Sequence, residues 1–533
     1  MEKREDANSI LPFLPLIYSS SSLLWLWPSP VVKVFKAISN GPDHSRVNSG
    51  ESLFLAISDI RNSLSLSSHP LVPSAPHGYA LFFDDLMLRA DSAKWFAHIL
   101  PKMAELLLRL PALLASHYKD ADSILEGVPT GLRILKQQHP GIVFLSQELI
   151  AALLTCSFFC LFPTSNRGAE DLPLINFDQL FEIVYENYSE RMEHKIKCIT
   201  NYFERISFCM PSGRVSFERK VLPLAPCPQE VSFPGVNMWS KSDVPLCRFL
   251  VYNSGLIEDQ SSEGLEVDFA NRYFGGGALR SGCVQEEIRF MTNPELIAGM
   301  LFLASMADNE AIEIVGTERF SDYVGYAHTF RFSGAHIDQK KVDRFGRRET
   351  RLIAIDALCS PQMRQYELKF ILREINKAFC GFLDQSKYQN FLRISQDCAH
   401  GTCGYPSDKD VVSGTSHWVK GGYMDNQDAV GIVTGNWGCG AFGGDPELKM
   451  VVQWLAASEA MRPFIAYYTF GLAALQSLEQ VTQWILSHKW TVGDLWHMLI
   501  EYSFQRISCD TDVGFLTWLV PSMSTNGDFM DMD

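Results

Sequence analysis

The most informative part of the sequence is Phe274-Gly275-Gly276-Gly277-Ala278-Leu279-Arg280-Ser281-Gly282-Cys283-Val284-Gln285-Glu286-Glu287. Three consecutive glycines lack a Cβ, so the backbone can take positive φ angles, approach a ligand closely and leave several N–H groups free to point at it. Glu286 and Glu287 follow where residues 288–306 begin an apolar helical pattern. Because a helix start favours anions, the stretch predicts a phosphate-type loop that leads into an acidic helix start.

The sequence on both sides supports a ligand site at this loop. Residues 265–271 alternate like a strand, and a second glycine-rich loop at residues 435–445 stands between an apolar run at 430–433 and a predicted helix at 446–460. A glycine triplet alone is equally consistent with a tight turn, and adjacent glutamates usually mark a solvated helix start. Their combination with a second loop of the same kind favours a ligand site.

This combination resembles the poly(ADP-ribose) glycohydrolases, specifically the plant members. The resemblance rests on the glycine triplet followed by Gln285-Glu286-Glu287, on residues 267–271 before it and on residues 435–445 after it. It covers nearly the whole chain, although only the part from about residue 249 onward carries motifs that identify chemistry. It implies a macrodomain-like three-layer α/β/α catalytic domain with an N-terminal, mainly α-helical accessory domain. It also implies hydrolysis of the ribose–ribose O-glycosidic bonds of poly(ADP-ribose), which releases ADP-ribose.

The catalytic residues that the resemblance implies are Asp268, Glu286 and Glu287. Neighbouring carboxylates point in different directions and are poorly placed to flank one glycosidic bond, so one is expected to react while the other binds. The resemblance implies that Glu287 protonates the departing ribose 2′ oxygen and then deprotonates the incoming water, which predicts retention at the anomeric carbon. Glu286, assisted by Asn271 and Gln285, would hold the ribose, and Asp268 would orient the loop or the sugar.

Further substrate-binding residues are implied in other stretches of the chain. The second loop would cradle the diphosphate through its backbone N–H groups, and the adenine would lie near Ile257 and Glu258. For Tyr326 and Phe470, taken singly, core packing is the default interpretation. The predicted substrate-binding residues are Ile257, Glu258, Asn271, Gly275, Gly276, Gly277, Gln285, Tyr326, Asn436, Trp437, Gly438, Cys439, Gly440, Ala441, Phe442 and Phe470. The scheme requires no metal and no organic cofactor.

Composition limits the partners that the chain can take. A length of 533 residues with 47% hydrophobic residues is typical of a globular protein with two cores. A net charge of -15 argues against a broad DNA-binding surface. Thirteen irregularly spaced cysteines indicate reduced thiols. The apolar stretches in residues 1–27 and 149–162 fit neither an export signal nor a membrane span. We therefore expect a monomer in the nucleus or the cytoplasm, with poly(ADP-ribose) and proteins that carry it as partners.

The predicted domain organisation has a helical accessory domain at residues 1–215, a catalytic domain at 216–515 and a C-terminal tail at 516–533. Within the catalytic domain, residues 384–428 are interpreted as a flexible insertion. In this insertion Cys398, His400 and Cys403 lack the paired spacing of a zinc module, so no metal site is predicted. A basic cluster at residues 340–348 is interpreted as a solvated loop in preference to a nuclear address.

Two other functions compete with hydrolysis. A macrodomain-like protein could bind ADP-ribose without cleaving it, as a reader, and would then not need both glutamates. A scaffold, in which the helical part recruits other proteins, is the third possibility.

Overall fold

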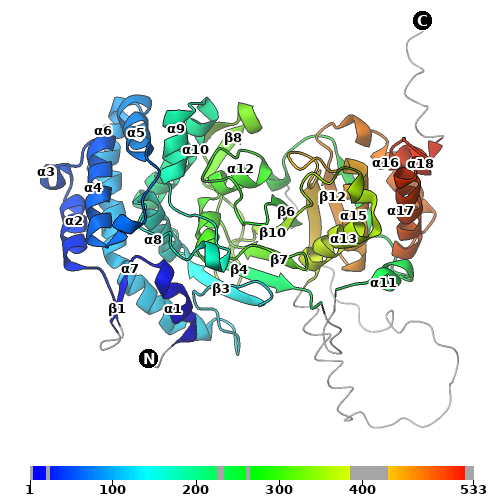
Figure 1. The fold of residues 1–533 in the computed structure, drawn as a ribbon, viewed down its shortest axis with the longest axis horizontal. Helices are drawn as coiled ribbons and strands as arrows, with labels where there is room; N and C mark the ends of the chain where they lie inside the picture. Colours follow the sequence, from blue (N-terminus) through cyan, green and yellow to red (C-terminus); the bar gives the residue numbers. More distant parts are fainter. Residues whose placement is uncertain (1–3, 20–23, 225–232, 260–263, 385–429, 522–533) are drawn as a thin grey trace, which may run out of the picture. The chain divides into compact units, whose positions relative to one another are not determined.

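The computed structural model describes residues 4–19, 24–224, 233–259, 264–384 and 430–521 (Figure 1). Two compact units divide the chain: Met1–Val221 with Asp268–Ala357, and Leu222–Val267 with Leu358–Asp533. This division differs from the predicted boundary after residue 215, because the segment 268–357 packs with N-terminal residues. The predicted insertion at 384–428, with Cys398, His400 and Cys403, lies outside the described residues apart from Asp384.

Helices form most of the N-terminal part of the first unit. The apolar stretch at residues 149–162 lies largely in a helix that ends at Phe158, and a later helical region is divided in two at residues 187–189. The helices up to residue 208 are α1 (Glu5–Ile10), α2 (Ser29–Ser39), α3 (Pro42–Ser45), α4 (Gly50–Ser63), α5 (Ala75–Ala80), α6 (Arg89–Lys94), α7 (Leu100–Asp120), α8 (Gln147–Phe158), α9 (Asp178–Glu186) and α10 (Glu190–Phe208).

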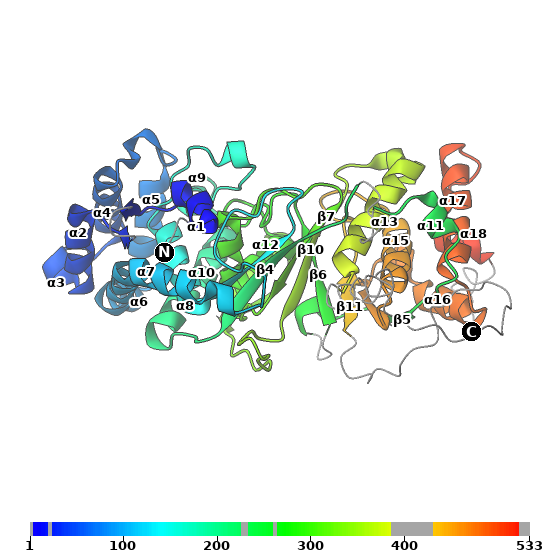
Figure 2. The same ribbon diagram turned by 90° about the horizontal axis from the view of Figure 1, so that it is seen from below.

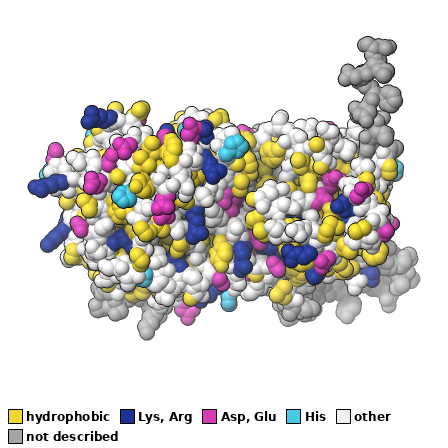
Figure 3. Space-filling model, turned by 45° about the horizontal axis from the view of Figure 1, so that its top comes forward, with side chains coloured by type: hydrophobic (Ala, Val, Ile, Leu, Met, Phe, Trp, Pro, Cys, Tyr) yellow, Lys and Arg dark blue, Asp and Glu magenta, His cyan; other side chains and the backbone are white. Residues whose placement is uncertain are grey.

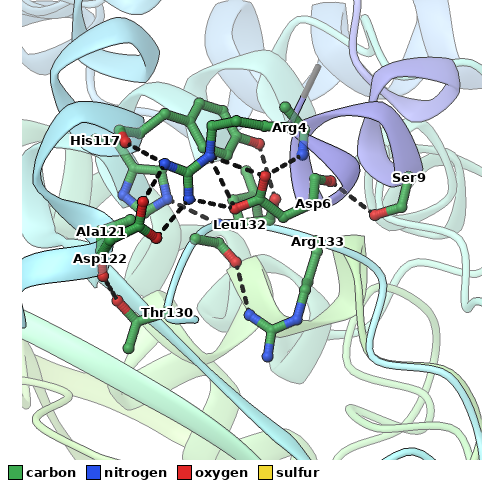
Figure 4. Close-up of polar contacts among 12 residues, drawn as sticks. Arg4, Asp6, Ser9, His117, Ala121, Asp122, Thr130, Leu132 and Arg133 are labelled. Atoms are coloured by element: carbon green, nitrogen blue, oxygen red, sulfur yellow. Dashed lines mark hydrogen bonds and ion pairs between the residues drawn. The ribbon is translucent and has the colours of Figure 1, made fainter. Parts of the chain in front are cut away.

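Polar contacts fasten the first of these helices to the rest of the unit (Figure 4). Arg4, just before α1, donates to the backbone oxygen of Tyr118 at 2.8 Å and forms an ion pair with Asp122 at 2.7 Å. Nearby, the Nε2 atom of His117 accepts from the backbone N–H of Leu132 at 2.8 Å, and burial lowers the pKa of His117 to about 4. The buried imidazole is therefore a neutral acceptor at physiological pH.

Four antiparallel strands of the first unit lie in the order β3 (Gly141–Ser146), β4 (Arg214–Val221), β7 (Glu310–Val315) and β10 (Arg351–Asp356). The sequence pattern missed β3 and β4. On β4, Arg219 and Lys220 are both buried and form ion pairs with Glu310 and Glu313 of β7. Charged residues that find partners inside a sheet remove the apolar alternation on which strand prediction depends. A separate pair of strands comprises β8 (Ser321–Val324) and β9 (Arg331–Ala335).

The helix that follows the glycine loop is shorter than expected. The sequence predicted a helix over residues 288–306, but α12 (Gln285–Thr292) stops before a 3₁₀ helix at Pro294–Leu301. Pro294 has no N–H to continue the helix, and it disfavours helical backbone at Asn293, whose φ is -122° and ψ is 70°. Both segments are buried, so the apolar pattern continues although the helix ends.

The second unit contains a parallel set of strands in the order β6 (Gly264–Ala270), β11 (Gly431–Gly435), β12 (Phe464–Tyr468) and β5 (Arg248–Tyr252). The predicted strand at residues 265–271 and the apolar run at 430–433 correspond to β6 and β11. The last three residues of β6, from Asp268, belong to the first unit. The helices are α11 (Val236–Ser240), α13 (Leu368–Phe382), α15 (Pro446–Glu459), α16 (Leu478–Ser487), α17 (Val492–Ile507) and α18 (Phe515–Leu519). Figures 1 and 2 show α13 beside α15, which packs against β12. No helix among the described residues is long and apolar enough to cross a membrane.

Candidate active site

The end of β6 is joined to the start of α12 through two side chains of the predicted motif. The Oε1 atom of Gln285 accepts from the backbone N–H of Phe269 at 2.8 Å. Both carboxylate oxygens of Glu286 accept backbone N–H groups, from Asn271 at 2.9 Å and from Gly275 at 2.8 Å. These contacts hold the strand end, the glycine loop and the helix start as one structure.

Glu287 is held in the same way by other amides. Its Oε1 accepts from the backbone N–H of Gly277 at 2.9 Å, and its Oε2 accepts from that of Val284 at 2.9 Å. The second contact satisfies an N–H at the start of α12 that has no partner within the helix. Glu287 is 7% exposed, compared with 2% for Glu286 and for Asp268. Of the three predicted catalytic carboxylates, Glu287 is therefore the one that solvent reaches most.

Asp268 completes a cluster of three carboxylates at this point of the first unit. Burial and the nearby charge of Glu287 raise the pKa of Asp268 to about 8, which leaves it mainly protonated at neutral pH. Burial, with Asp268 and Glu287 adding to it, also raises the pKa of Glu286 well above its usual value. The neighbouring glutamates do not simply point apart, as their adjacency suggested, because both carboxylates approach one glycine of the loop.

That glycine is Gly276, where two requirements for glycine coincide. Its φ of +47° is in the left-handed region. A Cβ at this position would lie 2.6 Å from Oε2 of Glu286 and 2.9 Å from Oε1 of Glu287, closer than real Cβ contacts. The middle residue of the triplet therefore lets the two carboxylates close on the backbone.

Lys195 of α10 holds the other side of the loop and was not among the predicted site residues. Its Nζ atom donates to the backbone oxygens of Arg280 and Gly282, both at 2.6 Å, and approaches that of Gly277 at 3.5 Å. Burial lowers the pKa of Lys195 to about 8, while the charge of Glu287 acts in the opposite direction. A signal was present, since Lys195 stands within the apolar stripe of α10 formed by residues 192, 196, 199 and 203.

Tyr326 lies in the turn between β8 and β9 and is 52% exposed. Partial burial raises the pKa of Tyr326, and a backbone hydrogen bond from Gln285 to its hydroxyl group lowers it. The nearby charge of Glu287 raises this pKa further. An exposed ring whose hydroxyl group lies at the start of α12 is thus part of the same site.

The second glycine-rich loop belongs to the second unit, between β11 and α15. Its turns are closed by hydrogen bonds from the N–H of Cys439 to the oxygen of Asn436 at 3.0 Å and from the N–H of Gly444 to the oxygen of Gly438 at 2.9 Å. In the described part of the chain no group accepts from the N–H of Gly438, Gly440, Ala441 or Phe442. Gly440 and Ala441 are exposed and the other two residues are half-buried, so these N–H groups can donate to solvent or to a ligand.

Other predicted residues of the second unit support or border this loop. The amide group of Asn436 donates to the oxygen of Thr469 at 3.1 Å, which links the loop to the end of β12, and Trp437 is fully buried. Ile257 is also buried, whereas Phe470 is half exposed with a φ of +53°. Glu258 lies in the short 3₁₀ helix Ile257–Asp259, which packs against β11. The predicted site residues thus form one group in each unit: in the first, Asp268, Asn271, Gly275, Gly276, Gly277, Gln285, Glu286, Glu287 and Tyr326; in the second, Ile257, Glu258, Asn436, Trp437, Gly438, Cys439, Gly440, Ala441, Phe442 and Phe470.

The family comparisons first define the class of protein, a glycohydrolase with a macro domain fold and a helical domain. Residues 236–477 match the family model described as poly(ADP-ribose) glycohydrolase, macro domain fold, and residues 87–219 match the model of the helical domain of that family. The chain belongs to the poly(ADP-ribose) glycohydrolase family.

Known relatives match over very different lengths. Poly(ADP-ribose) glycohydrolase 1 of Arabidopsis thaliana is 55% identical, and the alignment covers 98% of both chains. Probable poly(ADP-ribose) glycohydrolase 2 of the same plant is 51% identical over 98% of this chain and 100% of its own length. Poly(ADP-ribose) glycohydrolase 1 of Caenorhabditis elegans is 32% identical over 59% of this chain and 37% of its own length.

Proposed function

We propose that this chain is a poly(ADP-ribose) glycohydrolase, which hydrolyses the ribose–ribose O-glycosidic bonds of the polymer and releases ADP-ribose. Family membership supports the reaction, and one feature of the first unit carries the assignment of roles. Glu286 and Glu287 both approach Gly276, and of the two Glu287 is the more exposed.

In the proposed mechanism Glu287 is the general acid and then the general base. It protonates the departing 2′ oxygen and, once the leaving group has gone, takes a proton from water that attacks the same face of the sugar. A single carboxylate in both roles predicts a product of retained configuration. Glu286 holds the ribose that is cleaved, together with Asn271 and Gln285, and protonated Asp268 supports the loop.

For the rest of the substrate, we propose two further contacts. The free amides of residues 438, 440, 441 and 442 bind a diphosphate, because backbone N–H groups bind phosphate oxygens without needing basic side chains. Tyr326 supplies an exposed aromatic ring next to Glu287. We also expect the chain to act as a monomer in the nucleus or cytoplasm on proteins that carry poly(ADP-ribose).

The test measures the release of ADP-ribose from poly(ADP-ribosyl)ated protein by the wild-type chain and by Glu287→Gln and Glu286→Gln. An amide keeps the shape of the carboxyl group and can accept one of the two backbone N–H groups, but its NH2 group faces the other one, and it cannot supply the proton. We expect Glu287→Gln to bind the polymer and to lose at least about 100-fold in kcat, which is the lower range for removal of a general acid–base group. Glu286→Gln should lose binding of the ribose as well as rate.

Glu295→Gln is the matched control for these two variants. Glu295 is fully buried in the same unit and accepts from Gln147 at 2.8 Å and from the backbone of Glu318 at 2.8 Å, away from the glycine loop. Its variant should keep the wild-type rate. If the wild-type chain binds the polymer but releases no ADP-ribose, the protein is a reader and the acid–base role of Glu287 is wrong.

A further inference from the structure

A short hairpin between β9 and β10, which we call the basic hairpin, comprises residues 341–349. An antiparallel bridge joins Val342 to Arg348, and backbone hydrogen bonds run from the N–H of Glu349 to the oxygen of Lys341 at 2.9 Å and from the N–H of Asp343 to the oxygen of Arg347 at 2.7 Å. These bonds fix the backbone on both sides of the turn.

The side chain of Asp343 also holds the turn. Its Oδ1 atom accepts from the backbone N–H groups of Phe345 and Arg347, both at 2.9 Å. The oxygen of Gly346 accepts from the N–H of Arg214 at 2.8 Å, which ties the tip to the start of β4. The hairpin is therefore an ordered structure, and a ligand that binds to it needs little further ordering of the backbone.

Several cations of this hairpin have no acidic partner. Arg347 forms an ion pair with Asp343 at 2.8 Å, and Arg348 with Glu318 at 3.2 Å. Among the residues that the structure describes, no carboxylate pairs with Lys341 or Arg344 of the hairpin, or with the adjacent Arg214. All three are exposed.

This arrangement is unusual for a chain with a net charge of -15. Figure 3 shows acidic and basic side chains interspersed over the face that it presents, without one large patch of either sign. Exposed cations that stand together without acidic partners attract a polyanion, and this attraction weakens as salt is added.

Guanidinium groups of the hairpin are also held against an aromatic ring. Those of Arg344 and Arg347 lie 4.7 Å and 5.1 Å from the ring centre of Phe345, and Arg214 donates to the oxygen of Phe345 at 3.2 Å. Phe345 packs in turn against Phe144 of β3, with ring centres 6.0 Å apart. A planar guanidinium that is fixed in this way can form two hydrogen bonds to a phosphate and can stack on a base.

We propose that the basic hairpin is a second, non-catalytic binding site for the poly(ADP-ribose) chain, at which Lys341, Arg344 and Arg214 contact diphosphates of units away from the bond that is cut. This inference rests on the proposed function for its ligand. The hairpin shares no residue with the glycine loop, so it acts on binding of the chain and not on the chemical step. A long polymer carries many diphosphates and gains from such a site, whereas a substrate of two units gains little.

The test compares the wild-type chain with the double variant Lys341→Ala/Arg344→Ala. Hydrolysis of long poly(ADP-ribose) and of a two-unit fragment is measured over a range of salt concentrations. We expect KM for the long polymer to rise several-fold with kcat unchanged, and both constants for the fragment to stay the same. The dependence of log KM on log salt should weaken by about one for each phosphate contact removed.

The matched control is Lys33→Ala/Arg89→Ala, which removes two exposed cations from α2 and α6. If this control raises KM as much as the hairpin variant, net charge alone explains the effect and the proposal is wrong. An unchanged KM and salt dependence in the hairpin variant would also overturn it.

Binding of long poly(ADP-ribose) by the same hairpin variants in the Glu287→Gln background separates this proposal from the proposed function. Fluorescence anisotropy should show weaker binding for Lys341→Ala/Arg344→Ala and wild-type binding for Lys33→Ala/Arg89→Ala. This result would support the hairpin site even if no variant released ADP-ribose, and equal affinities would contradict it.

Discussion

Lys195 is a charged residue in an apolar surrounding, and its contacts explain why it is there. An unpaired ammonium group in a protein interior is costly, so a buried lysine needs acceptors close to it. Here the acceptors are backbone oxygens of the glycine loop, which a rigid turn presents in one direction. Burial of Lys195 is unfavourable, but its hydrogen bonds fix the loop next to Glu287.

Replacement of this lysine tests its role as a positioning residue. Lys195→Met keeps the length of the side chain but leaves the part-buried contacts to the oxygens of Arg280 and Gly282 without their donor, which costs up to about 1–3 kcal/mol. We expect kcat to fall about tenfold or more, with a smaller change in KM. Lys197→Met on the same helix, where Lys197 pairs with Glu193 at 2.6 Å, is the control and should keep the rate. A purely structural role would lower the melting temperature and leave kcat of the folded fraction unchanged.

The titration of Asp268 makes the unfolding free energy of the chain depend on pH. Its pKa is about 8 in the folded chain, compared with an ordinary value of 3.8, so the folded state binds the proton more tightly than the unfolded state. The stability that protonated Asp268 contributes is therefore complete below pH 3.8 and is lost as the pH rises to about 8. The largest possible slope for one proton is about 1.4 kcal/mol per pH unit.

Asp268→Asn removes this titration, because an amide does not ionise. Between pH 5 and pH 8 the melting temperature of the wild-type chain should fall more than that of the variant. Asp85→Asn, which changes an exposed aspartate in the same unit, should follow the wild-type curve. Parallel curves for wild type and Asp268→Asn would show that Asp268 is ionised throughout this range.

At the scale of elements, the two glycine loops use glycine for different reasons. Gly276 needs a positive φ and the absence of a Cβ, whereas Gly440 has no atom within 4 Å of the position where its Cβ would stand and does not have a positive φ. The first loop is built around side chains that fold back onto it. In the second loop the N–H groups of residues 438, 440, 441 and 442 have no acceptor among the described residues.

Alanine substitutions at Gly276 and Gly440 test this difference between the two loops. Gly276→Ala should cost at least about 1–2 kcal/mol of unfolding free energy for a left-handed backbone, and should displace both glutamates, with a loss of activity of more than tenfold. Gly440→Ala should keep the wild-type melting temperature. Thermal unfolding and release of ADP-ribose are measured for both variants. Equal melting temperatures for the two variants would show that Glu286 and Glu287 do not close on Gly276 in solution.

Features that depend on neighbouring residues were predicted from the sequence, whereas features that depend on tertiary contacts were not. The parallel strands and the start of α12 follow from apolar runs and from the glutamates, which are properties of neighbouring residues. The predicted end of α12 was wrong because the apolar pattern continues past Pro294, whereas proline stops a helix. The spacing of α10 marks Lys195 as buried, but its contacts with the glycine loop, like the convergence of the two glutamates, depend on side chains that meet across elements.

For the whole molecule, the first unit is discontinuous in sequence. One hydrophobic cluster runs from Ile10 to Ala354. Buried polar contacts join the same parts: Arg167 donates to the oxygen of Met300 at 2.7 Å, and Gln147 donates to Glu295 at 2.8 Å. The N-terminal helices are therefore structural partners of the segment that carries the glycine loop, and not an appended scaffold.

A chain that begins at residue 216 tests this conclusion. It would retain Glu286 and Glu287, but it would lack Lys195 and the N-terminal part of the hydrophobic cluster, which leaves the apolar faces of α12 and the following 3₁₀ helix exposed. We expect it to release no ADP-ribose and to aggregate or exchange its amide hydrogens rapidly at residues 274–301. Co-expression with residues 1–215 should restore activity in part, because the missing contacts are noncovalent. If the shortened chain alone cleaves poly(ADP-ribose) at the wild-type rate, the helices are dispensable for catalysis, and Lys195 has no part in positioning the loop.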